Sequence, residues 1–159
     1  MIHKPSSDPV LRALAECDPA AARKISGRDY CLAGIVVHGN HLGRTLGFPT
    51  ANIEPDKNSP VLIGHGVYIV GVYLSGHEFN GICNVGLRPT IGGNHLVAEV
   101  NILNFNEDIY GNPIKICFLE LIRKEKKFND LTELAEQISM DKVRALAYLS
   151  QIKPNSPGG

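Results

Sequence analysis

The chain has 159 residues, of which 16 are basic and 16 are acidic, so that its formal net charge is +0. This balance argues against a nucleic-acid-binding surface or a polybasic membrane-binding surface, because both need an excess of Lys and Arg. No apolar run approaches the roughly 20 residues that span a bilayer, and the polar N-terminus lacks the pattern of a signal peptide. The composition predicts a globular domain with its own core.

The four cysteines, Cys17, Cys31, Cys83 and Cys117, are far apart and form no CxxC motif. Two of them, Cys83 and Cys117, lie in apolar runs. This pattern favours reduced thiols over disulfides or a zinc site, and with them a cytoplasmic location.

The first 29 residues predict a short helical arm. Asp8 and Pro9 suit the first turn of a helix, and residues 20–25 predict a second helical segment that Gly27 ends. The arm is too short to form a domain of its own.

From Tyr30 onward the pattern becomes that of short strands rich in branched and aromatic residues. The predicted strands are residues 31–38, 51–53, 66–74, 79–85, 95–101 and 114–122. Residues 75–78, SGHE, predict a hairpin turn, whereas the glycine-rich residues 86–94 predict a loop.

No helix alternates with these strands, so the sheet should be antiparallel. Six antiparallel strands avoid exposed edges most simply by closing into a barrel. We therefore expect a mainly β fold: a six-stranded antiparallel barrel of Greek-key type, a C-terminal α-helix from about residue 131, and the N-terminal arm. The expected organisation is an arm or linker (1–29), a barrel domain with its helix (30–152) and a flexible tail (153–159).

The segment from His38 to Asn52, HGNHLGRTLGFPTAN, carries the first candidate site. Its glycines let a backbone approach a ligand closely, and Arg44 offers a planar fork for phosphate. Thr50 and Asn52 follow Pro49 and supply the oxygen ligands that magnesium prefers. The segment predicts a nucleotide-phosphate and magnesium site; the alternative interpretation is a tight β-turn with a buried Asx motif.

Glu99 is the second candidate. It is the only acid in the predicted strand around it, and partial desolvation of its carboxylate would suit a general base. The alternative is an outward-facing Glu on the solvent side of an amphipathic strand.

Residues 123–128, RKEKKF, form the third candidate. Phe128 and the neighbouring cations could close over a flat ligand by stacking. The alternative is a charged loop before the last helix, with Phe128 as a hydrophobic staple.

Five blocks resemble riboflavin kinases in order and spacing: GRTLGFPTAN, GVYIVGV, NVGLRPTIGG, AEVNILNFNEDIYG and LIRKEKKFNDLTEL. The resemblance covers most of the chain. It implies a small six-stranded antiparallel barrel with a C-terminal helix. It also implies an ATP-dependent kinase that transfers the γ-phosphoryl group to the 5′-hydroxyl of riboflavin, giving FMN and ADP.

The resemblance also implies residue roles at the phosphate end of the site. Thr50 and Asn52 would meet Mg²⁺ and the phosphates of ATP. Gly39, Arg44 and Gly47 would lie in a flap over those phosphates.

At the acceptor end, the resemblance makes Glu99 the catalytic base. Asn104 and Tyr110 fall near the nucleotide, and Arg123 and Phe128 in a second flap that covers the flavin. A non-catalytic flavin-binding or nucleic-acid-binding barrel is the alternative function.

The arm resembles the join between the two modules of bacterial bifunctional FAD synthetases, in which an adenylyltransferase domain precedes the kinase. That domain is absent from this sequence, so the resemblance implies either an excised kinase module or a stand-alone kinase that retains the arm. In both cases the chain is expected to make FMN and not FAD.

Overall fold

The structure, a computed structural model, describes residues 7–38, 50–58 and 61–152. The chain divides into two compact units, Met1–Glu125 and Lys126–Gly159, which are described separately. The elements of the first unit are α1 (Pro9–Ala15), α2 (Pro19–Ser26), β1 (Tyr30–Val37), β2 (Ala51–Pro55), β3 (Gly66–Leu74), β4 (His77–Thr90), β5 (Gly93–Ile102) and β6 (Pro113–Lys124).

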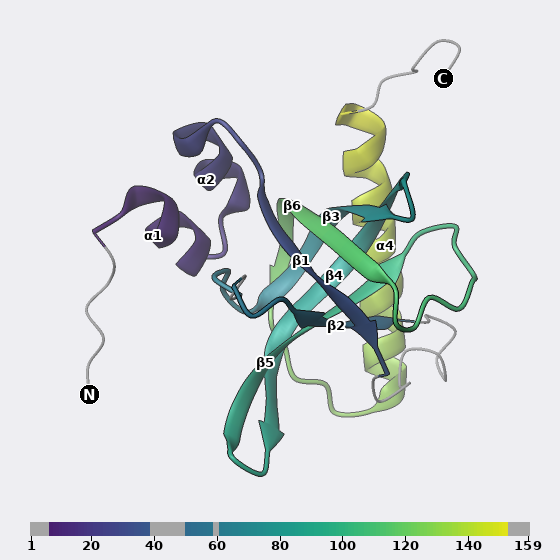
Figure 1. Cartoon of the computed structure of the whole chain (residues 1–159). Helices are drawn as coiled ribbons and strands as arrows, with labels where there is room; N and C mark the ends of the chain where they lie inside the picture. Colours follow the sequence, from purple (N-terminus) through teal and green to yellow (C-terminus); the bar gives the residue numbers. More distant parts are fainter. Residues whose placement is uncertain (1–6, 39–49, 59–60, 153–159) are drawn as a thin grey trace. The chain divides into compact units, whose positions relative to one another are not determined.

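The six strands close into a barrel in the order β1-β2-β5-β4-β3-β6, with every pair antiparallel. Figure 1 shows the strands crossing around the barrel. The strands β3, β4 and β5 follow one another as hairpins, and β2 returns beside β5, which is a Greek-key connection. The predicted fold is confirmed.

The barrel interior is filled by every second side chain of each strand, as the two-residue period of a strand requires. Tyr68 and Phe118 meet edge to face at its centre, with ring centroids 5.2 Å apart. The Tyr68 hydroxyl donates a 2.6 Å hydrogen bond to the Gly64 carbonyl, and burial raises the pKa of this hydroxyl. The other large, fully buried side chains of the strands include Leu32, Val36, Val70, Val72, Val85, Val100 and Ile116.

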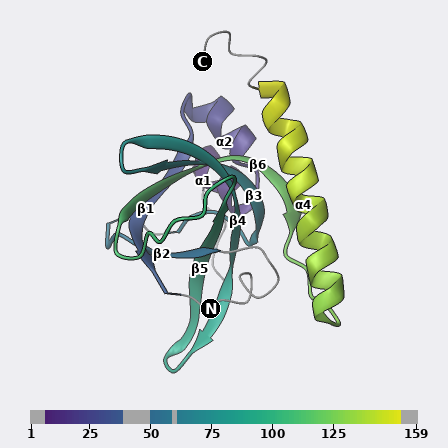
Figure 2. The ribbon, with the colours of Figure 1, turned by 90° about the vertical axis from the view of Figure 1, so that its right-hand side faces the viewer.

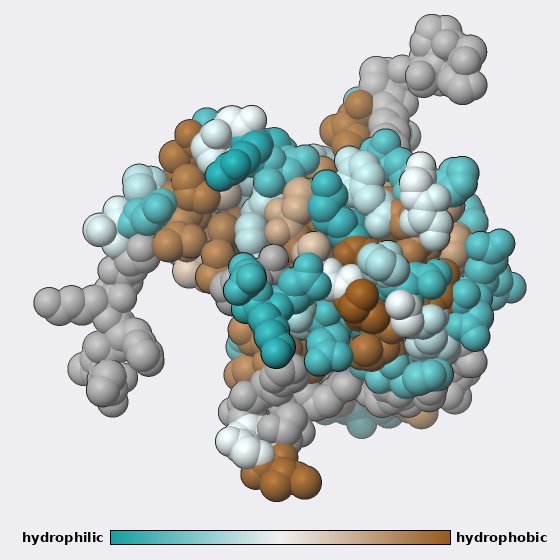
Figure 3. Space-filling view, viewed as in Figure 1, coloured by the Kyte–Doolittle hydropathy of each residue, from teal (hydrophilic) through white to brown (hydrophobic). Residues whose placement is uncertain are grey.

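The N-terminal arm packs against the barrel and shares its core. The Gly64 amide donates a 2.9 Å hydrogen bond to the Leu14 carbonyl, and the Cys17 thiol donates to the His65 carbonyl at 3.4 Å. A Cβ at Gly64 would lie 2.6 Å from Cys17 Sγ, so this close approach requires glycine. Figure 3 shows hydrophobic residues gathered on the outer surface of the arm, where Leu11 and Ile25 are exposed.

The two predicted turns of the β3–β4–β5 region had different outcomes. The hairpin turn predicted at residues 75–78 is confirmed in place but is shorter than predicted. Ser75 and Gly76 form it with positive φ (52° and 77°), whereas His77 and Glu78 already belong to β4 and pair with β3. The predicted loop at residues 86–94 is wrong, because β4 and β5 stay paired as far as Thr90 and Gly93. The two strands project from the barrel as a two-stranded ribbon (Figures 1 and 2), where a proline is tolerated because both strands are edges.

A disulfide joins Cys31 on β1 to Cys117 on β6. The prediction of four reduced thiols is therefore wrong for this pair, whereas Cys17 and Cys83 are free. The two bonded cysteines are 86 residues apart in the sequence, and the β1–β6 pairing that closes the barrel places them directly opposite each other.

Removing this disulfide should lower stability. A double variant, Cys31→Ser with Cys117→Ser, is expected to lose about 2–4 kcal/mol of unfolding free energy, because the open chain has more freedom when unfolded. Urea denaturation measures the difference. Dithiothreitol should destabilise the parent protein to the same extent and leave the double variant unchanged; equal stability of the oxidised and reduced parent would contradict the prediction.

The second unit contains α4 (Leu131–Ile152). Asp130 Oδ1 accepts a 2.8 Å hydrogen bond from the Glu133 amide, and the Glu133 carboxylate accepts a 2.9 Å bond from the Asn129 amide. This reciprocal arrangement resembles a capping box and explains why the helix begins where predicted. The Lys126 ammonium lies 5.7 Å from the centroid of the Phe128 ring. Within the described ranges, every helix is too short or too polar to cross a membrane.

Candidate active site

A row of three polar residues crosses neighbouring strands of the barrel. Glu99 on β5 lies directly opposite Asn52 on β2 and, on its other side, directly opposite Asn84 on β4. Directly opposed residues of an antiparallel pair project from the same face of the sheet. Because their neighbours Ile53, Ala98 and others point into the core, all three polar side chains lie on the outer face of the barrel.

Exposure increases along this row. Asn52 is only 5% exposed, Glu99 is half-buried and Asn84 is exposed. Glu99 therefore faces outward, as the alternative interpretation of its strand required. An outward orientation is still compatible with a functional role, because Glu99 has the polar residues Asn52 and Asn84 on either side of it on the outer face.

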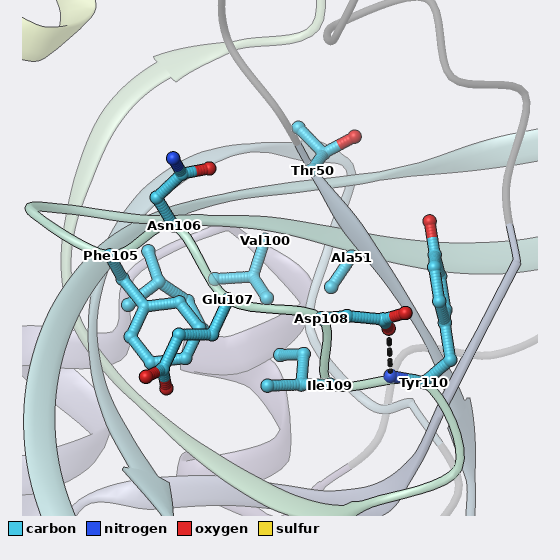
Figure 4. Close-up of a pocket in the computed structure, with 10 residues that line it drawn as sticks. Thr50, Ala51, Val100, Phe105, Asn106, Glu107, Asp108, Ile109 and Tyr110 are labelled. Carbon is cyan, nitrogen blue, oxygen red and sulfur yellow. Dashed lines mark hydrogen bonds between the residues drawn. The ribbon is translucent and has the colours of Figure 1, made fainter.

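A cavity of about 520 Å³ lies beside one end of the row. Figure 4 shows its lining residues: Thr50, Ala51, Val100, Ile102, Phe105, Asn106, Glu107, Asp108, Ile109 and Tyr110. Thr50 belongs to the cavity and also stands two residues before Asn52 on an extended chain, so the two side chains point to the same side. Thr50 thus connects the cavity with the polar row.

The cavity has an apolar floor and an acidic rim. Phe105 and Ile109 supply ring and aliphatic surface, whereas Glu107 and Asp108 are exposed carboxylates. Asp108 Oδ1 accepts a 3.1 Å hydrogen bond from the Tyr110 amide, which holds the segment in place. Figure 4 shows the Thr50 and Tyr110 hydroxyls directed to the same side of the cavity, and the His38 ring stacks on the Tyr110 ring with centroids 3.7 Å apart.

The structure brings together only part of the predicted site. Thr50 and Tyr110 line one cavity, and Asn52 and Glu99 are cross-strand neighbours. Asn104 is exposed with a positive φ of 56° and is not among the lining residues of the cavity.

The other predicted residues are distributed differently. Gly39, Arg44 and Gly47 lie outside the described residues. Arg123 on β6 continues the row of polar residues across β3, because Val67 on β3 lies opposite both Asn84 and Arg123. Phe128 belongs to the second unit.

Three residues of this region were missed from the sequence. Glu107 and Asp108 were given no role, although an acidic pair two residues before the predicted nucleotide residue Tyr110 was a usable signal. Asn84 was missed because its proximity to Glu99 depends on the β4–β5 register, which the sequence pattern alone does not supply.

Cys83 precedes Asn84 on β4 and is fully buried inside the barrel. Burial raises the pKa of its thiol, and the negative charge of Glu99 adds to the effect. The thiol is therefore neutral and enclosed, which makes it unsuitable as a nucleophile.

The described residues contain no group of three or more His, Cys, Asp and Glu side chains that could hold a metal ion. The oxygen donors of this region are instead an amide on β2 (Asn52), opposite Glu99, and a hydroxyl (Thr50) just before β2. Hard oxygen donors of this kind fit a magnesium ion that takes its remaining ligands from phosphates and water. They would not fit a dedicated zinc site.

The site thus consists of a carboxylate between two amides on a closed antiparallel barrel, with a cavity nearby that has a hydroxyl on its rim. This is the arrangement of a small-molecule-binding barrel domain. The family model for flavokinase (riboflavin kinase) matches residues 26–149. The chain belongs to the riboflavin kinase family.

A curated relative and one of two similar solved structures are named as riboflavin kinases. The bifunctional riboflavin kinase/FMN adenylyltransferase of Bacillus subtilis is 41% identical over 153 residues, which are 94% of this chain and 48% of that protein. The chain thus spans about half the length of the curated relatives it matches. The crystal structure of riboflavin kinase from Trypanosoma brucei is 29% identical, with a TM-score of 0.56, and the match covers 79% of this chain and 81% of that one. A structure described as the macrolide-efflux protein of Streptococcus pneumoniae is 34% identical over 87% of this chain and 45% of that chain, with a TM-score of 0.80.

Proposed function

We propose that the chain is a riboflavin kinase, which transfers the γ-phosphoryl group of ATP to the 5′-hydroxyl of riboflavin. The observation that carries the proposal is the direct pairing of Asn52 with Glu99, beside a cavity whose rim includes Thr50. Phosphoryl transfer depends on positioning and charge neutralisation more than on covalent chemistry. A carboxylate next to neutral oxygen donors supplies both a base and a place for phosphate.

The nucleotide is proposed to enter the cavity with its phosphates toward Thr50. The acidic rim supports this direction, because Glu107 and Asp108 would repel phosphate but can accept hydrogen bonds from ribose hydroxyls or an exocyclic amine. Phe105 and Ile109 offer apolar surface for the base. The predicted phosphate contacts of Arg44 and of the glycines remain proposals for residues outside the described part of the chain.

Magnesium is proposed to bind at Thr50 and Asn52. When bound, it would offset the charge of the β- and γ-phosphates. The burial of Asn52, at 5% exposure, supports a ligand role, because a buried amide has few orientations and is held ready for its partner.

Glu99 is proposed to accept the proton of the riboflavin 5′-hydroxyl as its oxygen attacks the γ-phosphorus. The new oxygen–phosphorus bond forms as the bond to the β,γ-bridging oxygen breaks, so that the products are FMN and ADP. Arg123 and Phe128 are proposed to contact the flavin.

Two broader proposals follow from the family. The first is a cytoplasmic location, because the proposed reaction consumes ATP. The Cys31–Cys117 disulfide means that reduced thiols no longer support this location for that pair of cysteines. The second concerns a partner: the named activities of the bacterial relatives include FMN adenylylation, and we propose that an adenylyltransferase domain is the functional neighbour of this kinase.

Incubation with riboflavin, ATP and Mg²⁺, followed by chromatography, tests the proposal. We expect equal amounts of FMN and ADP, no FAD, and no FMN when Mg²⁺ is chelated. Tight flavin binding without ATP turnover would favour the non-catalytic flavin-binding barrel instead.

A further inference from the structure

Asn84 lies beside the proposed base on the side opposite the proposed phosphate site. It is directly opposite Glu99 across β4 and β5, just as Asn52 is across β2 and β5. Neighbouring strands are about 4.8 Å apart. Asn52 and Asn84 therefore stand roughly 10 Å apart, with the carboxylate of Glu99 between them.

The order of this row fixes the direction from which an acceptor must come. Asn52 is buried, and its chain neighbours Thr50 and Ala51 line the cavity, so that the proposed function places the phosphate donor on this side of Glu99. An in-line transfer places the attacking group on the far side of the phosphorus. The acceptor chain therefore approaches Glu99 over the open end of the row, where Asn84 is exposed.

The charges around Asn84 favour a neutral, hydroxyl-rich chain. Glu99 lies across the strand pair, and the Glu125 carboxylate lies over Gly86, where a Cβ would be 2.7 Å from Glu125 Oε1. His65 Nδ1 is 3.7 Å from the other oxygen of Glu125. An anionic group would be repelled by the two carboxylates, whereas hydroxyls can donate to carboxylates and exchange hydrogen bonds with an amide.

We propose that Asn84 is a specificity-determining residue, whose side-chain amide binds the inner hydroxyls of the acceptor's polyol chain while Glu99 faces the terminal one. The inference rests on the proposed kinase function and assigns a residue to it that the sequence did not single out. It predicts that Asn84 distinguishes a polyol chain from an alkyl chain of equal length.

The test compares two acceptors: riboflavin, and the flavin with a 5-hydroxypentyl chain, which keeps the terminal hydroxyl but lacks the inner ones. Asn84→Ala should raise the KM for riboflavin about 3–10-fold, the loss typical of one or two neutral hydrogen bonds. The KM for the hydroxypentyl flavin should change by less than about 2-fold, since this acceptor has no hydroxyl there to lose. The KM for ATP and the kcat should stay close to the parent values.

Asn80→Ala is the matched control, because Asn80 is the same residue type on the same face of β4, opposite Gly71 of β3 and roughly 13 Å from Asn84. It should leave the ratio of the two KM values unchanged. If Asn84→Ala folds poorly, Asn84→Leu keeps the branched shape of the side chain without its hydrogen bonds and should show the same loss of discrimination.

The outcomes separate this inference from the function on which it rests. Equal KM increases for both acceptors, or no increase for either, would overturn the role of Asn84 while the parent still makes FMN. Failure of the parent to phosphorylate either acceptor would overturn the kinase function itself.

Discussion

Replacing Glu99 with glutamine should lower the kcat for FMN formation by about 10²–10⁴-fold, which is the usual contribution of a general base. Glutamine has almost the same shape, but its amide cannot accept the proton of the attacking hydroxyl. The KM values for riboflavin and ATP should change little, because the neutral amide still fits between Asn52 and Asn84. Steady-state kinetics with both substrates varied would separate these effects.

Glu78→Gln is a suitable control for this experiment. Glu78 is an exposed glutamate on the same barrel, at the start of β4 and opposite Tyr73. Its loss should leave kcat unchanged. If Glu99→Gln retained near-normal kcat, Glu99 would have no role as a base, although its position beside Asn52 would remain.

The sequence predicted well those features that depend on local pattern. The turn at Ser75 and Gly76 was found because both residues tolerate positive φ and stand between two β-forming runs. The start of α4 was found because Asp130 and Glu133 supply a local cap. Neither feature needs information from a distant part of the chain.

Features that depend on strand register were not predicted. Cys31 and Cys117 meet only because β1 pairs with β6 to close the barrel. The projecting β4–β5 ribbon was predicted as a loop because Pro89 and the nearby glycines are typical of loops. The pairing of β4 with β5 has no signature in the local sequence. Periodicity gives the face of each residue but not its cross-strand partner.

The candidate site combines both kinds of information. Thr50, Asn52 and Glu99 were singled out from the sequence, but local reasoning alone left each with an alternative interpretation. The register Asn52↔Glu99 places two of them side by side, and the cavity adds Thr50. The β4–β5 register identifies Asn84, which lies opposite Glu99 and whose neighbours in sequence, Cys83 and Val85, gave no sign of a functional face.

Replacing Thr50 with valine should weaken the binding of the Mg²⁺–nucleotide complex by about 10–100-fold, as expected when a hydrogen-bonding or ligand oxygen at a charged group is lost. Valine keeps the branched shape that suits an extended backbone, so the barrel should fold normally. Calorimetric titration of ADP, with and without Mg²⁺, measures the effect, which should be much smaller when Mg²⁺ is absent.

Thr50→Ser provides the decisive comparison, because serine retains the hydroxyl and removes only the methyl group. If the hydroxyl carries the interaction, the affinity of the serine variant for Mg²⁺–ADP should lie within a few-fold of the parent's, whereas the affinity of the valine variant should be about 10–100-fold lower. An equal loss in both variants would instead assign the effect to packing at the cavity rim against Tyr110 and its neighbours. Unchanged affinity in both would separate Thr50 from the phosphate site, and the nucleotide would then have to meet Glu99 by another route than the cavity described here.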